Sequence, residues 1–134
     1  MTGDDLLATV LDRLLPAVGE LPGAGGLGLA AGIPGVTSAP VLDALPPGFA
    51  AQAKEEQVTA LRAVEAAAPA AFAVLVKAAY TAYYADRRVL AAIETATGYA
   101  ARPPQPLGYE LEPFDPALLE VVRNRPSHYR ETRP

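Results

Sequence analysis

Large hydrophobic side chains recur at helical spacing in one stretch near the middle of the chain. The stretch from Pro69 to Tyr84 carries them at the intervals of three and four residues that place side chains on one face of a helix. They are Phe72, Leu75, Val76, Tyr80, Tyr83 and Tyr84, with Ala79 filling the remaining position. Lys77 is the one charged residue in the stretch. The pattern predicts a central, mostly buried helix whose apolar surface must be covered by the rest of the chain or by a partner.

The same periodicity predicts further helices on both sides of this one. They span residues 4–15, 50–67, 89–97 and 116–124, and a short helical turn is expected at 39–45. Residues typical of helix ends agree with these limits. Gly98 follows one helix as a C-terminal stop, and Asp115 with Pro116 supplies an N-cap and a first helical position for another. The sequence therefore predicts an all-α fold of about four to five helices.

Two regions of the chain are dense in proline and glycine. The chain has 14 prolines and 11 glycines among its 134 residues, which is well above average use of the two residues. One region, residues 16–48, connects the first two long helices and is expected to be ordered only by packing on something else. The other begins after Gly98. The predicted organisation is a helical domain at 1–98, including the connection, and a Pro-rich C-terminal arm at 99–134 with one short helix.

Charge and composition exclude several classes of protein. The net charge is −4 and there is no cysteine, so a general nucleic-acid binder, a disulfide framework and thiolate metal sites are all disfavoured. The N-terminal stretch is acidic, unlike a signal peptide. No apolar run reaches the roughly 18 residues of a membrane span without an interruption. These features predict a cytoplasmic protein that binds no nucleic acid and does not span a membrane.

The sequence offers little that could carry catalysis or hold a metal. His128 is the only histidine, and one histidine without cysteine cannot assemble a typical zinc site. The glycines of residues 23–28 satisfy a bare G-x-G-x-x-G pattern, but no predicted strand precedes them, as a dinucleotide site requires. Those glycines are interpreted as flexible or close-packed backbone. No catalytic, cofactor-binding or metal-ligating residue is therefore predicted in this chain.

The tyrosines are the candidate functional residues. Five of them lie around the central helix and the chain that leaves it, where they can either pack in the core with their hydroxyls at its edge or form a protein interface. Core packing is the favoured interpretation of the cluster as a whole. The stretch from Arg102 to Tyr109 is Pro-rich and loses little entropy on docking, so it is expected to lie along this domain or a partner. The predicted contact residues are Tyr83, Tyr84, Tyr99, Arg102, Tyr109 and Tyr129.

Two short motifs resemble those of a known family. The first is DRLLPA at Asp12–Ala17, at the end of the first helix. The second is a segment rich in aromatic residues that ends near an aspartate and is followed later by a Gly-Tyr pair. In this chain its residues are Tyr80, Tyr83, Tyr84, Asp86, Gly98 and Tyr99. In this order they resemble the small-subunit family of gluconate 2-dehydrogenase, often called subunit 3. The similarity covers most of residues 5–110.

The resemblance implies a non-catalytic partner of a larger dehydrogenase. Members of that family accompany a flavin-containing enzyme of the glucose-methanol-choline type and support its folding, stability or export. The implied protein is a stably associated small subunit in a hetero-oligomer that acts on a sugar or glycoside. FAD would be bound by the partner and no cofactor by this chain. The chain differs from many members in lacking a twin-arginine leader and in carrying the extra C-terminal arm, so a cytoplasmic complex is expected.

Two other readings of the sequence remain open. The chain can be a stand-alone helical adaptor, which would be a stable monomer without a large partner. It can also be a small enzyme that uses Tyr, Asp and Arg side chains in a helical pocket. Turnover by the isolated chain would favour the enzyme, and loss of all activity without a second subunit would count against it.

Overall fold

Helices joined by turns and irregular segments make up the part of the chain that the structure describes. The computed structural model describes residues 2–100 and 112–126. Within them every named element is a helix, and the all-α prediction is confirmed. The chain divides into two compact units, Met1–Ala101 and Arg102–Pro134, whereas the predicted boundary falls between residues 98 and 99.

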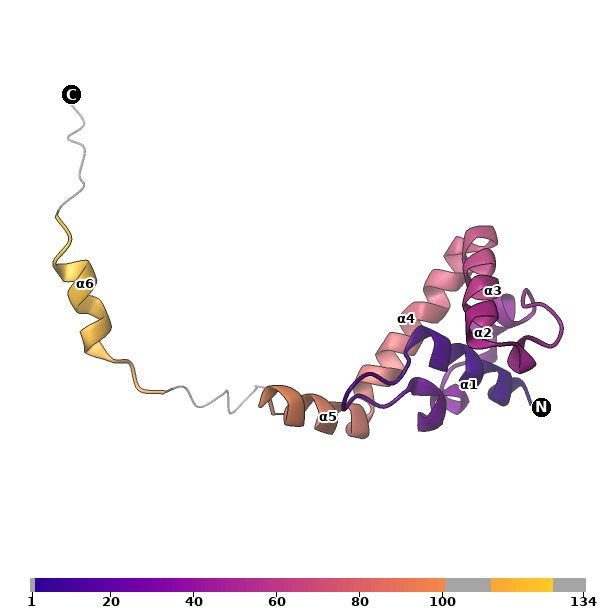
Figure 1. Cartoon of the computed structure of the whole chain (residues 1–134), viewed down its shortest axis with the longest axis horizontal. Coiled ribbons are helices and arrows are strands. Elements are labelled where there is room, and N and C mark those ends of the chain that lie inside the picture. The colour runs from indigo at the N-terminus through magenta and orange to yellow at the C-terminus, as the bar shows by residue number, and fades with distance from the viewer. Residues whose placement is uncertain (1, 101–111, 127–134) are drawn as a thin grey trace, which may run out of the picture. The chain divides into compact units, whose positions relative to one another are not determined.

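The first unit contains five α-helices and three short 3₁₀ helices among its described residues (Figure 1). In chain order they are α1 (Gly3–Leu14), η1 (Ala24–Leu27), η2 (Leu29–Gly32), α2 (Gly35–Leu42), η3 (Phe49–Ala51), α3 (Lys54–Ala67), α4 (Pro69–Ala85) and α5 (Arg87–Thr97). The second unit contains η4 (Pro116–Leu119) and α6 (Glu120–Arg123).

Local chemistry explains where several helices begin and end. The Thr2 hydroxyl accepts a hydrogen bond from the Asp5 N–H at 3.2 Å, and the Asp5 carboxylate accepts one from the Thr2 N–H at 2.7 Å. This reciprocal capping box starts α1. At the other end of the unit, α5 stops at Gly98, whose φ of 73° is the left-handed conformation that glycine adopts without strain. These ends are therefore encoded locally.

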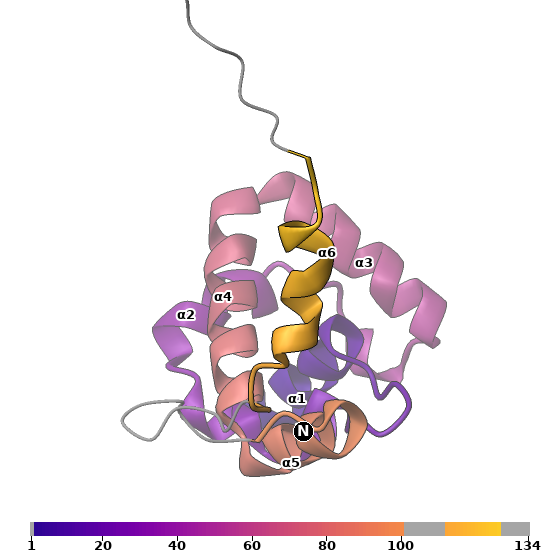
Figure 2. The same cartoon turned by 90° about the vertical axis from the view of Figure 1, so that its left-hand side faces the viewer.

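The core lies between the inner face of α4 and the elements that pack on it. Phe72, Leu75, Ala79 and Tyr83 of α4 are buried, and Leu75 is fully inaccessible. Helices α2, α3 and α5 contact α4. Figure 2 shows α3 and α4 diverging from their joint at Ala68, the residue that ends one helix and precedes the other. The predicted central helix is thus the element around which the unit is built.

Helix α2 differs from its prediction. The sequence predicts a helical turn at 39–45, ended by Pro46 and Pro47, but α2 runs from Gly35 to Leu42 with Pro40 inside it. The N–H groups of Thr37 and Ser38 both donate to the Pro34 carbonyl, at 2.8 and 3.3 Å. An interior proline removes one helical hydrogen bond. The helix buries Val41 completely, and this packing offsets that loss.

Candidate protein-interaction surface

The outer face of α4 carries large apolar side chains that the described residues do not cover. Val74 is 56% exposed, Tyr80 45% and Tyr84 47%. The sequence pattern groups both tyrosines with the buried stripe, but the elements that pack on α4 cover a narrower arc than that stripe spans. The central helix therefore has a buried inner face and a largely apolar outer one, on which Lys77 is the only charge.

Ring packing orders the exposed tyrosines. The rings of Tyr80 and Tyr84 are nearly parallel, 3° apart in orientation, with centroids 6.1 Å apart. Tyr84 also meets the ring of Tyr83 edge to face at 5.1 Å. Both arrangements are favourable for aromatic pairs. Because the buried Tyr83 supports Tyr84, and Tyr84 supports Tyr80, the aromatic surface is held in place before any partner binds.

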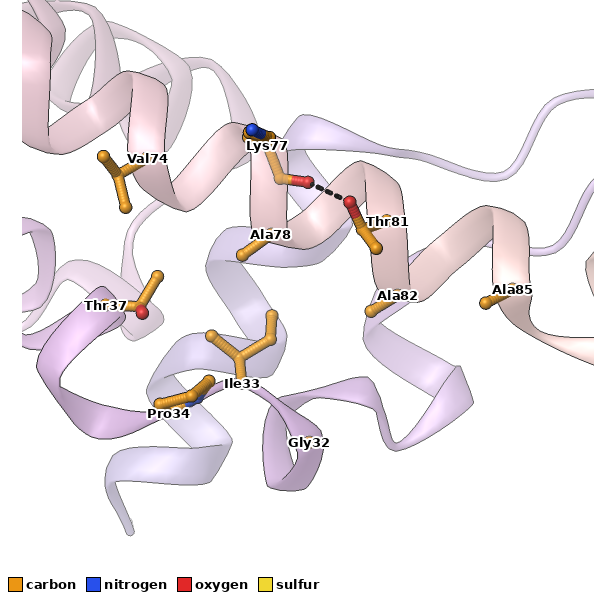
Figure 3. A pocket seen from close by; sticks show the side chains of 10 residues that line it. All are labelled: Gly32, Ile33, Pro34, Thr37, Val74, Lys77, Ala78, Thr81, Ala82 and Ala85. Atoms are coloured by element: carbon orange, nitrogen blue, oxygen red, sulfur yellow. Dashed lines mark hydrogen bonds between the residues drawn. The ribbon is translucent and has the colours of Figure 1, made fainter.

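A shallow apolar groove runs beside this helix (Figure 3). It has a volume of about 510 Å³ and lies between α4 and the chain from η2 into α2. Its lining residues are Gly32, Ile33, Pro34, Thr37, Val74, Lys77, Ala78, Thr81, Ala82 and Ala85. The Thr81 hydroxyl donates to the Lys77 carbonyl at 2.9 Å, so that polar group is already satisfied within the helix. Small and apolar side chains make the groove suited to another hydrophobic element rather than to a polar ligand.

The residues that carry the family resemblance pack against the glycine-rich loop. A Cβ atom on Gly25 would lie 2.7 Å from the Asp12 Cβ and 2.9 Å from the Ala8 carbonyl oxygen. One on Gly23 would lie 2.5 Å from the Asp12 Oδ1. At Gly25 these atoms leave no room for a side chain, so the close-packing interpretation is confirmed there, whereas at Gly23 a Cβ would require the Asp12 carboxylate to move. The loop lies directly on the last turns of α1, where DRLLPA begins.

Two side chains from the far end of α4 and the start of α5 hold the same loop. The Tyr83 hydroxyl donates to the Pro22 carbonyl at 2.7 Å, and the Arg88 Nη2 donates to the Leu27 carbonyl at 2.7 Å. Burial raises the pKa of the Tyr83 hydroxyl, which keeps it protonated as a donor. The loop is thus fixed at both of its ends by residues about sixty positions away in the sequence.

Asp86 positions Arg88 for this contact. Its carboxylate caps α5 by accepting the Arg88 N–H at 2.8 Å, and it accepts the guanidinium Nη2 at 2.8 Å. These hydrogen bonds from Arg88 lower the pKa of Asp86 to about 2. The second motif of the resemblance, around Tyr83 and Asp86, therefore meets the first at one loop. Both motifs have a structural role in this fold.

The structure separates the predicted contact residues. Tyr84 and Tyr99 are exposed, Tyr99 by 70%. Tyr83 is only 2% exposed, because its ring packs in the core and its hydroxyl binds the Pro22 carbonyl, so its side chain is not available to a partner. Arg102, Tyr109 and Tyr129 lie outside the described residues, as does His128. The sequence analysis did not name Val74 as an exposed residue. Val74 directly precedes the buried Leu75, and neighbouring residues of a helix point in different directions, so the sequence could have placed it away from the core.

The second unit exposes its apolar side chains as well. Every described residue from 112 to 126 is exposed. The large apolar ones are Phe114, Leu118, Leu119, Val121 and Val122. The predicted helix at 116–124 is present as η4 followed by α6.

No other kind of site stands out in the described residues. Within residues 2–100 and 112–126, no three His, Asp or Glu side chains gather closely enough to hold a metal ion. None of the helices described there is both long and apolar enough to cross a bilayer. No protein-family model matches the chain, and neither does any curated protein or solved structure.

Proposed function

We propose that this chain is a non-catalytic small subunit that binds and stabilises a larger FAD-dependent oxidoreductase of the glucose-methanol-choline type. The observation that carries the proposal is the outer face of α4, where Val74 lines the apolar groove and the rings of Tyr80 and Tyr84 are exposed on the same helix. Exposed apolar patches on soluble proteins mark interaction sites when they are contiguous. Tyrosine is enriched at protein interfaces because it offers a large rigid surface with a polar tip.

The nature of the partner rests on the family resemblance. The motif that starts at Asp12 and the motif around Tyr83 and Asp86 pack on one loop of this fold, so the residues of the resemblance form one structural arrangement. In this proposal the partner binds FAD and abstracts hydride from a carbon of a sugar or glycoside. The small subunit contributes surface and stability, and binds no cofactor itself.

The proposed complex is a cytoplasmic hetero-oligomer. The absence of cysteine from the 134 residues fits a reducing compartment. A standard interface buries roughly 800 Å² on each partner, which is more than three half-exposed side chains of α4 can supply. Other surfaces of the chain are therefore expected to add to the contact.

Purification of the chain from its own cells under mild conditions tests the proposal. The expected product is a yellow complex far larger than 13.9 kDa, with flavin absorption bands and a second polypeptide. A colourless monomer would overturn the proposal and leave a stand-alone helical adaptor as the better reading.

Paired variants then locate the contact. Tyr80→Ser with Tyr84→Ser is expected to release the flavin-containing partner, because it removes both exposed rings. Ala66→Ser, an exposed position on α3, is the control and is expected to leave the complex intact. Equal recovery of the complex from both variants would show that α4 is not part of the contact.

A further inference from the structure

Helix α5 buries fewer residues than any other α-helix described in the first unit. It lies at one end of the unit (Figure 1), and Val89 is its one buried residue. By contrast, α1 and α3 each bury three residues and α4 buries four. Leu90 and Ile93 are partly buried, and among the described helices only α4 contacts α5 extensively. Little apolar surface therefore holds α5 against the rest of the unit, which is typical of a segment that opens locally.

A single residue joins α5 to α4. Asp86 ends one helix and caps the other, with the extended backbone angles φ −72° and ψ 129°. Its carboxylate accepts hydrogen bonds from the Arg88 N–H at 2.8 Å, from Nε at 3.0 Å and from Nη2 at 2.8 Å. All three bonds lie within α5 and its cap, so they persist if the helix rotates about Asp86. A residue at the end of an element can absorb the dihedral change of such a hinge.

Arg88 also ties α5 to the glycine-rich loop. Its Nη2 donates to the Leu27 carbonyl at 2.7 Å, and the bonds to Asp86 hold the guanidinium in the orientation that reaches this carbonyl. The Arg88 side chain is 58% exposed, so water can replace the contact. Separation of α5 from the unit breaks this bond and uncovers Val89, but it leaves the hydrogen bonds inside the other helices in place.

We propose that α5 is a latched strap, which opens about Asp86 as an intact helix while the rest of the first unit stays folded, and that the hydrogen bond from Arg88 to Leu27 is the latch. Opening turns Val89, Leu90 and Ile93 toward solvent, so the latch controls whether this apolar face is accessible. Proteins open in local units at free energies below that of global unfolding. The inference concerns this chain alone and does not depend on the proposed partner.

Thiol labelling of two single-cysteine variants tests the opening. The chain has no cysteine, so Val89→Cys in α5 and Val10→Cys in α1 each introduce the one thiol, at positions that are both 0% exposed. The thiol at position 89 is expected to react with an aromatic disulfide reagent at least about tenfold faster than the thiol at position 10, because local opening is more frequent than global unfolding. Equal rates would overturn the inference, since α5 would then open only when the whole unit unfolds.

Two arginine variants test the latch. In the Val89→Cys background, Arg88→Ala removes the bond to Leu27 and is expected to speed labelling about fivefold. Its bonds to Asp86 are lost from the closed and open forms alike, so they do not contribute to the difference. Arg87→Ala is the matched control, because Arg87 is exposed and has no hydrogen bond or ion pair within the described residues. It should stay within about twofold. If the two variants label alike, Arg88 is not the latch and that part of the inference is overturned.

Hydrogen exchange supplies a test that leaves α5 itself unchanged. The amide groups of α5 should exchange faster than those of α4 in the wild-type chain. Leu7→Ala, which truncates a buried side chain of α1, should speed exchange in α4 and leave the rates in α5 unchanged, because α5 opens without disturbing Leu7. Faster exchange in both helices would show a single cooperative unit and overturn the inference.

Discussion

Two regions of this chain share a high proline content and differ in structure. Residues 16–48 and residues 112–126 are both rich in proline, and each contains only short helical elements. The first region buries a series of side chains in the core of its unit: Ala24, Leu27, Ala30, Ile33, Ser38 and Val41. The second buries none of its described residues. Proline content therefore does not decide whether a segment folds onto its own domain.

The difference comes from the packing and hydrogen bonds that each region makes within its own unit. In residues 16–48, glycines let the backbone lie directly on α1, and side chains from α4 and α5 bind the Pro22 and Leu27 carbonyls. The two hydrogen bonds satisfy backbone carbonyl groups, and the close backbone contact fills the space beside α1. Residues 112–126 instead leave their large apolar side chains exposed, and none of the described residues of that unit is buried.

Removal of one large side chain from each region gives the largest expected contrast. Ile33→Ala is expected to lower the free energy of unfolding by about 3 kcal/mol, because Ile33 is 7% exposed and the change leaves a cavity. Leu118→Ala should change it by less than about 0.5 kcal/mol, as at other exposed positions. Urea unfolding followed by far-UV circular dichroism measures both. Equal losses would mean that the second region is also part of the core.

Addition of one methyl group to the loop gives the next largest effect. Gly25→Ala is expected to destabilise the protein by about 2 kcal/mol, because the new Cβ would collide with Asp12 and with the Ala8 carbonyl. Gly26→Ala is the matched control, since nothing lies within 4 Å of its Cβ position. Thermal unfolding compares the two. If they unfold alike, the loop does not lie against α1 as described.

Loss of one hydroxyl should have a smaller effect. Tyr83→Phe keeps the buried ring and removes the hydrogen bond to Pro22, so a loss of about 1 kcal/mol is expected. Tyr84→Phe, whose ring is half exposed, should unfold as the wild type does. The prediction fails if the two substitutions cost the same.

The smallest expected effect is a dependence on pH. Hydrogen bonds from Arg88 lower the pKa of Asp86 to about 2, below the usual value near 4 for an unfolded chain. Its stabilising contribution is therefore fully present above about pH 4 and is lost as the pH falls toward 2. Asp86→Asn should lower the urea midpoint at pH 6 and have less effect at pH 2.5. An equal effect at both values would exclude this carboxylate as the source.

The sequence correctly predicted features that depend on neighbouring residues, such as the extent of the central helix and two helix caps. The helix from Pro69 was predicted to within one residue of its end at Ala85, because a long 3.6-residue period is strong. The caps at Asp115 and Gly98 were also predicted correctly, since each depends only on neighbouring residues. The predicted start of α2 at residue 39 was wrong, because the helix begins at Gly35 and contains Pro40, and neither residue is typical of a helix interior.

Contacts between distant segments could not be predicted. The sequence placed Tyr83, Tyr84 and Tyr80 in one stripe, and only the covering helices show that Tyr83 faces inward. The Pro22 carbonyl that binds Tyr83 is 61 residues away, and the groove beside α4 is built from two separate segments. No spacing within one helix carries that information.

Hydrogen exchange of the full chain, alone and in its purified complex, tests the central claim most directly. The Ala24 N–H donates to the Leu15 carbonyl inside the first unit and should exchange slowly in both samples. The Asn124 N–H donates to the Glu120 carbonyl in a motif with no buried side chain, so it should exchange rapidly in the free chain and slowly in the complex. Rapid exchange at Asn124 in both samples would contradict the account, since the partner would then leave residues 112–126 uncovered.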